Sequence, residues 1–487
     1  MPTRRSVLTG LGAGLLGSLI RPGRAVATPP SGLEGYNVLE IFLGGGVSHR
    51  ETFWHQPGVT CDRFGYIDGI DWSGLTDGWQ PSGVNVAVHD DMDPDKTNGF
   101  VFSPCIRPLL GTPFLDNYRV VHTQHTLTPH VVAQPYMLGG QTPGRERYAG
   151  SAAVANLAYA TSDVLAGWVL DANPGSSLGR HAAASGLLGT TYRPPVIPFT
   201  SKLDSFLDRL GQPDAAEQQA LLSLYADRYD EALRFSGGGT ARSEGFQDFT
   251  GVQDTLFSRL EIAETLQDAI YPPGQPGVYL APNTDDMTSR AIRAGARLIH
   301  QGSARYVAIL DQGNVVIDGK SFGRDSHARG DQDSWTRHAE VHNLSAWRIF
   351  QTLRAAYDGG YLDPAKTLVV LNTEFGRSPD QGLKECPAAA DPMDAGGYTS
   401  WGSYHWPSAF TVLLLGGPFL GRRVLGNLSY ETDEGESAGG VISGSDFVDP
   451  EDLRVAINAV LGKDSGDLDL FGVGSTPVND VRAAMAF

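Results

Sequence analysis

Four short segments place hydroxyls, carboxylates and imidazoles next to glycines or apolar runs. The first is Gly-rich and carries Ser48, and the second is Asp325-Ser326-His327. The third is Glu374-Phe375-Gly376-Arg377, and the fourth is Tyr404-His405-Trp406-Pro407. Mixed carboxylate and imidazole ligands suit zinc, manganese or similar ions, and a guanidinium near a carboxylate suits an oxyanion. Alone, each segment is explained as well by a tight turn, a polar loop, a structural ion pair or an aromatic packing turn.

A fifth group consists of His122, His125 and His130, which fall within nine positions of a chain that has 12 histidines in all. This density indicates a site, although a single core or surface histidine is commoner than a ligand.

Short apolar runs alternate with segments of helical periodicity, and this alternation predicts where the four segments lie. A doubly wound, mostly parallel sheet flanked by helices is expected, in one α/β domain over 31–487 with a long loop excursion near 54–104. Such sheets hold their sites at the carboxyl ends of the strands. Strands are expected at 37–43, 118–122, 306–311, 367–372 and 410–415, and helices at 215–235, 246–270, 287–301, 338–357 and 450–461.

The first 27 residues have the pattern of a twin-arginine (Tat) export signal. Arg4 and Arg5 precede a weakly apolar, Gly-rich run that ends near Ala27. The run is shorter than the roughly 20 apolar residues that a membrane-spanning helix needs, so we expect cleavage rather than retention as an anchor. The expected location is therefore periplasmic or extracellular, with no integral membrane segment after cleavage.

The charge and the cysteine content argue against a nucleic-acid-binding protein and against a disulfide-rich scaffold. The formal charge is −18, and removal of residues 1–27 takes it to −22 because four arginines and no acids are lost. An acidic surface disfavours nucleic acid as a partner. The cysteines, Cys61, Cys105 and Cys386, are odd in number, so at most one internal disulfide can form, and their spacing gives no metal signature.

Together, the segments resemble the Tat-exported domain of unknown function 1501 family, a branch of the alkaline phosphatase/sulfatase superfamily. Residues 45–53 resemble the family's Gly-Gly-Pro-Ser opening, and His130 with Tyr136-Met137 resembles its His-x-x-Ala-x-x-Tyr-Met segment. The other three segments resemble its Asp-Thr-His, Glu-Phe-Gly-Arg and Asp-His-Trp-Pro elements, in the same order.

The resemblance implies an alkaline phosphatase-like fold and a divalent metal site, with zinc, manganese or calcium as the ion. It implies Ser48 as the nucleophile and Arg377 as the oxyanion-binding residue. The implied metal ligands are Asp325, His327, Glu374 and His405.

Three departures from the family pattern put that site in question. Glu51 stands where Asp is usual, Trp54 where a second Asp is often found, and Tyr404 where Asp precedes the histidine. Each change removes or alters a carboxylate ligand, so a reduced site, or none, remains an alternative.

Two functions follow from the resemblance. The first is an exported metal-dependent hydrolase of phosphate or sulfate esters, with a small-molecule or polymer ester as substrate. The alternative is a catalytically inactive relative that acts as a binding or assembly protein of the cell envelope, because a fold alone does not assign a function.

Overall fold

The computed structural model describes the central part of the chain and most of the segments that form the candidate site. Residues 1–27, Ser48, Glu51 and His327, and most of the 54–104 excursion, lie outside the described residues. The described ranges are 36–47, 52–55, 86–87, 101–102, 104–141, 150–159, 166–172, 194–199, 287–311, 313–317, 320–325, 338–378, 404–419, 421–426, 428–429, 440–441 and 448–461, with single positions between 183 and 266.

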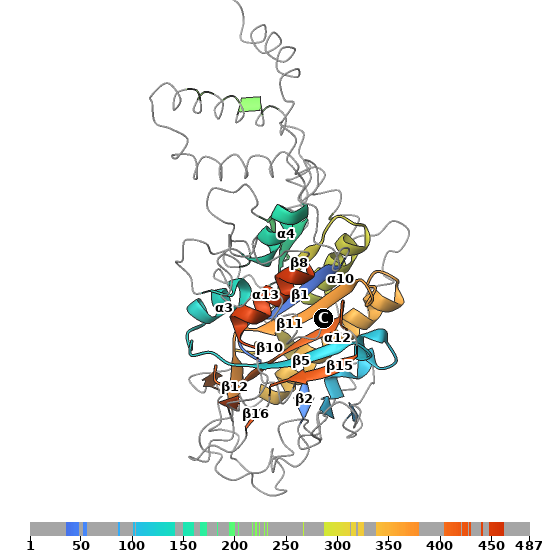
Figure 1. Cartoon of the computed structure of the whole chain (residues 1–487), viewed down its shortest axis with the longest axis vertical. Helices are drawn as coiled ribbons and strands as arrows, with labels where there is room; N and C mark the ends of the chain where they lie inside the picture. Colours follow the sequence, from blue (N-terminus) through green and yellow to red (C-terminus); the bar gives the residue numbers. More distant parts are fainter. Residues whose placement is uncertain are drawn as a thin grey trace, which may run out of the picture.

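An eight-stranded sheet forms the centre of the described structure (Figure 1). Its order is β15-β5-β14-β11-β1-β8-β6-β7. Only β14 runs against its two neighbours, and every other pairing is parallel. The strands are β1 (Asn37–Leu43), β5 (Tyr118–Thr123), β6 (Gly167–Asp171), β7 (Val196–Pro198), β8 (Tyr306–Asp311), β11 (Thr367–Thr373), β14 (Phe410–Gly416) and β15 (Arg422–Leu425).

Helices cover both faces of the sheet, which is why its central strands are mostly apolar. On β1, Leu39 and Ile41 pack in one hydrophobic cluster, whereas Val38 and Phe42 pack in the other. The first cluster includes α10 (Met287–His300) and α12 (His338–Asp358), and the second includes α3 (His130–Gly139), α4 (Ser151–Tyr159) and α13 (Pro450–Val460). The mostly parallel α/β sheet flanked by helices is thus confirmed.

The element predictions agree with the structure to within one or two residues for the five predicted strands and for α10, α12 and α13. The predicted start of α13 is also confirmed, because the Asp449 side chain accepts a hydrogen bond from the Asp452 backbone N–H at 2.8 Å. No strand was expected at β6, β7 or β15, and no helix at α3 or α4. The predicted helices 215–235 and 246–270 lie almost wholly outside the described residues.

None of the helices within the described ranges combines the length and the apolar character needed to cross a membrane.

Candidate metal site at the strand ends

The segments that could carry chemistry lie together at one end of the strands of the sheet. The parallel strands β1, β5 and β11 end here, and the chain continues into Gly44–Gly46, into His125 and His130, and into Glu374. β14 is antiparallel, so the residues that precede it reach the same edge. A two-stranded ribbon of β12 (Gly376–Ser378) and β13 (Tyr404–Trp406) therefore places Arg377 opposite His405.

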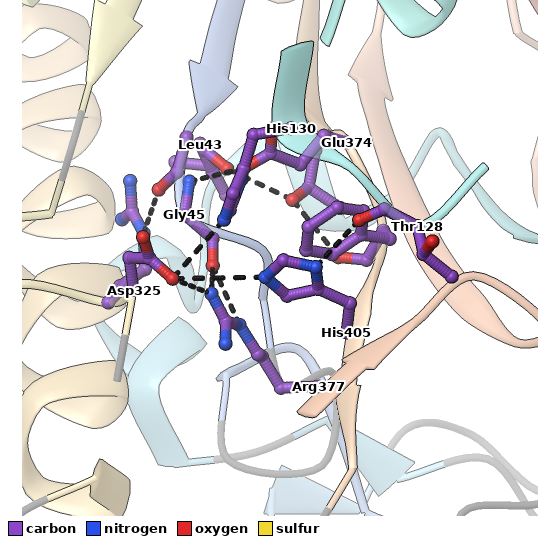
Figure 2. A network of polar contacts seen from close by, with 12 residues as sticks. Leu43, Gly45, Thr128, His130, Asp325, Glu374, Arg377 and His405 are labelled. Atoms are coloured by element: carbon purple, nitrogen blue, oxygen red, sulfur yellow. Dashed lines mark hydrogen bonds and ion pairs between the residues drawn. The ribbon is translucent and has the colours of Figure 1, made fainter. Parts of the chain in front are cut away.

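Three side chains converge at this edge: His130, Asp325 and His405 (Figure 2). One ligand atom of each lies within 4.8 Å of those of the other two. The Asp325 Oδ1 atom is 3.3 Å from His130 Nε2 and 4.0 Å from His405 Nε2. The Asp325 side chain is 39% exposed, so the group is accessible from solvent.

The backbone partner of His405 fixes its tautomer. His405 Nδ1 lies 2.6 Å from the Thr128 carbonyl oxygen, which can only accept a hydrogen bond. Nδ1 must therefore carry the proton, which leaves the Nε2 lone pair of the neutral ring directed at Asp325. Histidine ligands of metals are commonly fixed in this way, through the ring nitrogen that does not bind the metal.

His130 has an equivalent partner in a carboxylate. Its Nδ1 lies 2.8 Å from Glu374 Oε1, and the Glu374 side chain is fully buried. The same oxygen accepts a hydrogen bond from the Gly45 backbone N–H at 2.6 Å. His130 therefore directs Nε2 to the site while Nδ1 donates to Glu374.

Arg377 supports the third member of the group. Its guanidinium Nη2 donates to Asp325 Oδ1, and Nε donates to the Gly45 carbonyl oxygen at 2.7 Å. The Arg377 side chain is fully buried in this position. A planar guanidinium can bridge two acceptors at a fixed angle, so it determines where the carboxylate lies.

Aromatic packing holds the two imidazoles in place. The Phe375 ring stacks on His405 with a centroid separation of 4.3 Å, and it lies 5.0 Å from the His130 ring.

The His125 side chain does not point to the ligand group. Its Nδ1 accepts a hydrogen bond from the Leu127 backbone N–H, so its Nε2 donates to the Glu374 carbonyl oxygen. Burial lowers the pKa of His125, in keeping with a neutral structural ring.

The charges of the site shift the pKa values of its members. Burial alone would lower the pKa of His130, but Asp325 and Glu374 outweigh it and raise this pKa to about 9. Burial would raise the pKa of Asp325, but the contacts with His130 and Arg377 lower it. Without a metal ion, His130 is therefore a cation at neutral pH, and a metal ion at Nε2 must displace a proton.

The structure brings together four of the residues named from the sequence. Asp325 and His405 belong to the group of potential ligands, whereas the side chains of Glu374 and Arg377 contact those ligands and Gly45. The third potential ligand is His130, which the resemblance did not imply as one. Ser48 and His327 lie outside the described residues.

The donor set fits a divalent transition metal. Two imidazole nitrogens and one carboxylate oxygen match the three protein ligands of catalytic zinc sites, in which a further position stays open to solvent or substrate. The group could therefore hold a metal ion through His130, Asp325 and His405.

No model of a protein family matched the chain, and a search of curated proteins found no match.

Proposed function

We propose that this chain is an exported, metal-dependent hydrolase of phosphate or sulfate esters with an alkaline phosphatase-like fold. The observation that carries the proposal is the convergence of His130, Asp325 and His405 at the carboxyl edge of a mostly parallel sheet. Sheets of this kind hold ligands at that edge. The resemblance of the four segments to a branch of the alkaline phosphatase/sulfatase superfamily supplies the reaction class.

Of the three ions that the resemblance implies, zinc is the one that the ligand types favour. Calcium takes six to eight oxygen ligands, whereas two of the three side chains here offer nitrogen. Imidazole suits zinc, copper, iron and nickel, and three protein ligands leave a position for the reacting group.

A divalent cation held here would supply Lewis-acid polarisation of an ester oxygen. The residues that would hold it are His130 and His405, through Nε2, and Asp325, through Oδ1. The exposure of Asp325 leaves a path for a substrate from solvent. Ser48, three residues after Gly45, is the proposed nucleophile on the strength of the resemblance alone.

One observation favours the second candidate, an inactive relative that serves as a binding or assembly protein of the cell envelope. Asp325 is paired with Arg377, and His130 is paired with Glu374, so the site is electrostatically balanced without a metal ion. A site that is stable in this state does not need a metal to fold.

Metal analysis of the purified mature protein, coupled to assays with aryl phosphates and aryl sulfates, separates the two candidates. We expect bound zinc and turnover of at least one ester in the wild type, with turnover lost and zinc binding strongly weakened in His405→Ala. His125→Gln is the matched control, because His125 contacts the Glu374 backbone and not the ligand group. A wild type without metal and without turnover would favour the inactive relative.

Export through the Tat pathway is part of the same proposal. Replacing Arg4 and Arg5 by lysine should leave the precursor in the cytoplasm, because the twin-arginine pair is the feature that distinguishes this signal. Cell fractionation measures the outcome, and undiminished export of the double variant would refute the assignment.

A further inference from the structure

Gly45 is a common anchor for the two charged residues that surround the candidate ligands. Its backbone N–H donates to Glu374 Oε1 at 2.6 Å, and its carbonyl oxygen accepts from Arg377 Nε at 2.7 Å. The residue adopts a φ of +96°, and a Cβ built on it would lie 2.8 Å from the Asp325 backbone nitrogen. Only glycine allows this conformation and this close approach without strain.

Each of these two charged residues also contacts one of the candidate ligands. Glu374 Oε1 lies 2.8 Å from His130 Nδ1, and Arg377 Nη2 donates to Asp325 Oδ1. Both side chains are fully buried, so neither is free to sample other positions in solvent. Glu374 thereby fixes the orientation of His130, and Arg377 fixes that of Asp325.

We propose that Glu374 and Arg377 are positioning residues that act on the metal site through His130 and Asp325, rather than as a metal ligand and an oxyanion-binding group. This inference rests on the proposed metal site. Carboxylates that accept the outer N–H of a histidine ligand orient the ring and increase its basicity, and their loss typically lowers metal affinity about 10–100-fold.

The geometry of Glu374 separates it from the three candidate ligands. Its Oε1 atom is already shared by the Gly45 N–H and His130 Nδ1, and it lies on the far side of the His130 ring from Nε2. The rival arrangement uses the other carboxylate oxygen, Oε2, which is buried and receives no hydrogen bond from the described residues. A test must therefore distinguish direct ligation through Oε2 from action through His130.

Double-mutant cycles of zinc affinity, measured by competition with a chromophoric chelator, make that distinction. Glu374→Gln should weaken zinc binding about 10–100-fold in the wild type and in the His405→Ala background. In the His130→Ala background it should have almost no effect, because the ring that it orients is gone. The same loss in all three backgrounds would identify Glu374 as a direct ligand and overturn the inference.

The same kind of double-mutant cycle tests the role of Arg377. Arg377→Gln should weaken zinc binding in the wild type and in His405→Ala, but not in Asp325→Ala. Arg377→Lys keeps the charge but loses the planar fork, so it should recover only part of the affinity. An undiminished effect of Arg377→Gln when Asp325 is absent would show that Arg377 does not act through that carboxylate.

A measurement on the wild type covers the case in which Glu374→Gln does not fold. In a ¹H–¹⁵N spectrum of the zinc-loaded protein with labelled histidine, assigned with His130→Ala, we expect His130 protonated at Nδ1 and zinc-bound at Nε2. Zinc bound at Nδ1 would overturn the inference while leaving the proposed metal site intact. A wild type that binds no zinc would refute the proposed function and, with it, the inference.

Discussion

Two buried carboxylates, Glu40 and Glu374, differ in how completely their oxygens are hydrogen-bonded. Glu40 lies on β1 within the sheet, and each of its oxygens has two donors. Oε1 accepts from Asn372 and Arg454, and Oε2 accepts from Tyr306 and Arg454, at distances of 2.5–2.9 Å. This network is closed, because no acceptor position of the carboxylate is left to a ligand.

The network around Glu374 is open. Its Oε2 atom is buried without a hydrogen bond from the described residues, and the neighbouring Asp325 is 39% exposed. Buried polar groups are normally satisfied, so this oxygen lacks the kind of partner that each Glu40 oxygen has. The comparison separates a carboxylate with complete hydrogen bonds in the centre of the sheet from one that leaves an oxygen without a described partner beside the candidate ligands.

The largest expected effect comes from breaking the closed network. Arg454→Met leaves Glu40 as a buried charge without its counter-ion, and such a loss typically costs about 3–5 kcal/mol of unfolding free energy. Denaturant unfolding measures the change. The double variant Glu40→Leu/Arg454→Met should recover much of the loss, and a cost below about 1 kcal/mol in the single variant would contradict the closed network.

Two glycines with similar backbone conformations allow the site to be compared with a turn that has room for a side chain. Gly45 and Gly111 both have positive φ, but a Cβ on Gly111 meets nothing within 4 Å. Gly111→Ala should cost about 1–2 kcal/mol from the left-handed backbone alone. Gly45→Ala should cost more, because the added Cβ clashes with the Asp325 backbone, and it should also lower zinc affinity.

Equal costs for the two alanine variants, with zinc binding unchanged in Gly45→Ala, would show that Gly45 is not an anchor of the site.

Acid should weaken the closed network. Burial alone would raise the pKa of Glu40, but the charge and hydrogen bonds of Arg454, with Tyr306 and Asn372, lower it from 4.5. A lowered pKa adds stability that is fully present above pH 4.5 and is lost as the pH falls through the folded-state value. The stability advantage of the wild type over Glu40→Gln should therefore shrink below about pH 4.5 in urea titrations; a constant difference would contradict this assignment.

Within the closed network, a smaller effect than that of Arg454→Met is expected from Tyr306→Phe, which removes one donor to Glu40 and leaves the ion pair in place. Burial and the adjacent carboxylate raise the pKa of Tyr306, so its hydroxyl stays protonated and donates. A hydrogen bond to a charged group contributes about 1.5–3 kcal/mol, so a loss in the lower part of that range is expected in thermal unfolding. No loss would mean that another donor replaces the hydroxyl.

The sequence predicted the five middle strands of the sheet well and missed β6, β7 and β15, which flank them. β1, β8 and β11 are mostly apolar because helices cover both faces. By contrast, β6 has five residues that begin with Gly and end with Asp, and β7 has three that end with Pro. Segments this short, with turn-type residues at their ends, look like loops until a neighbouring strand pairs with them.

The candidate site was predicted in part: Asp325 and His405 were expected as ligands, but His130 was not. The histidines near β5 show why. His122, His125 and His130 follow each other closely, but their side chains point to Thr411, to the Glu374 backbone and to the ligand group, respectively. Only the turn after β5 decides which ring reaches the site. The resemblance implied Glu374 as a metal ligand, whereas in the structure its Oε1 atom contacts His130 Nδ1 and the Gly45 backbone N–H.

If His130, Asp325 and His405 form a metal site, calorimetric titration of the mature protein with zinc should show close to one zinc bound per chain. We also expect His405→Ala to weaken zinc binding by more than the roughly 100-fold limit for residues that only orient a ligand, with the unfolding free energy preserved. No zinc binding by the folded wild type, or unchanged binding by His405→Ala, would show that these three residues do not form a metal site.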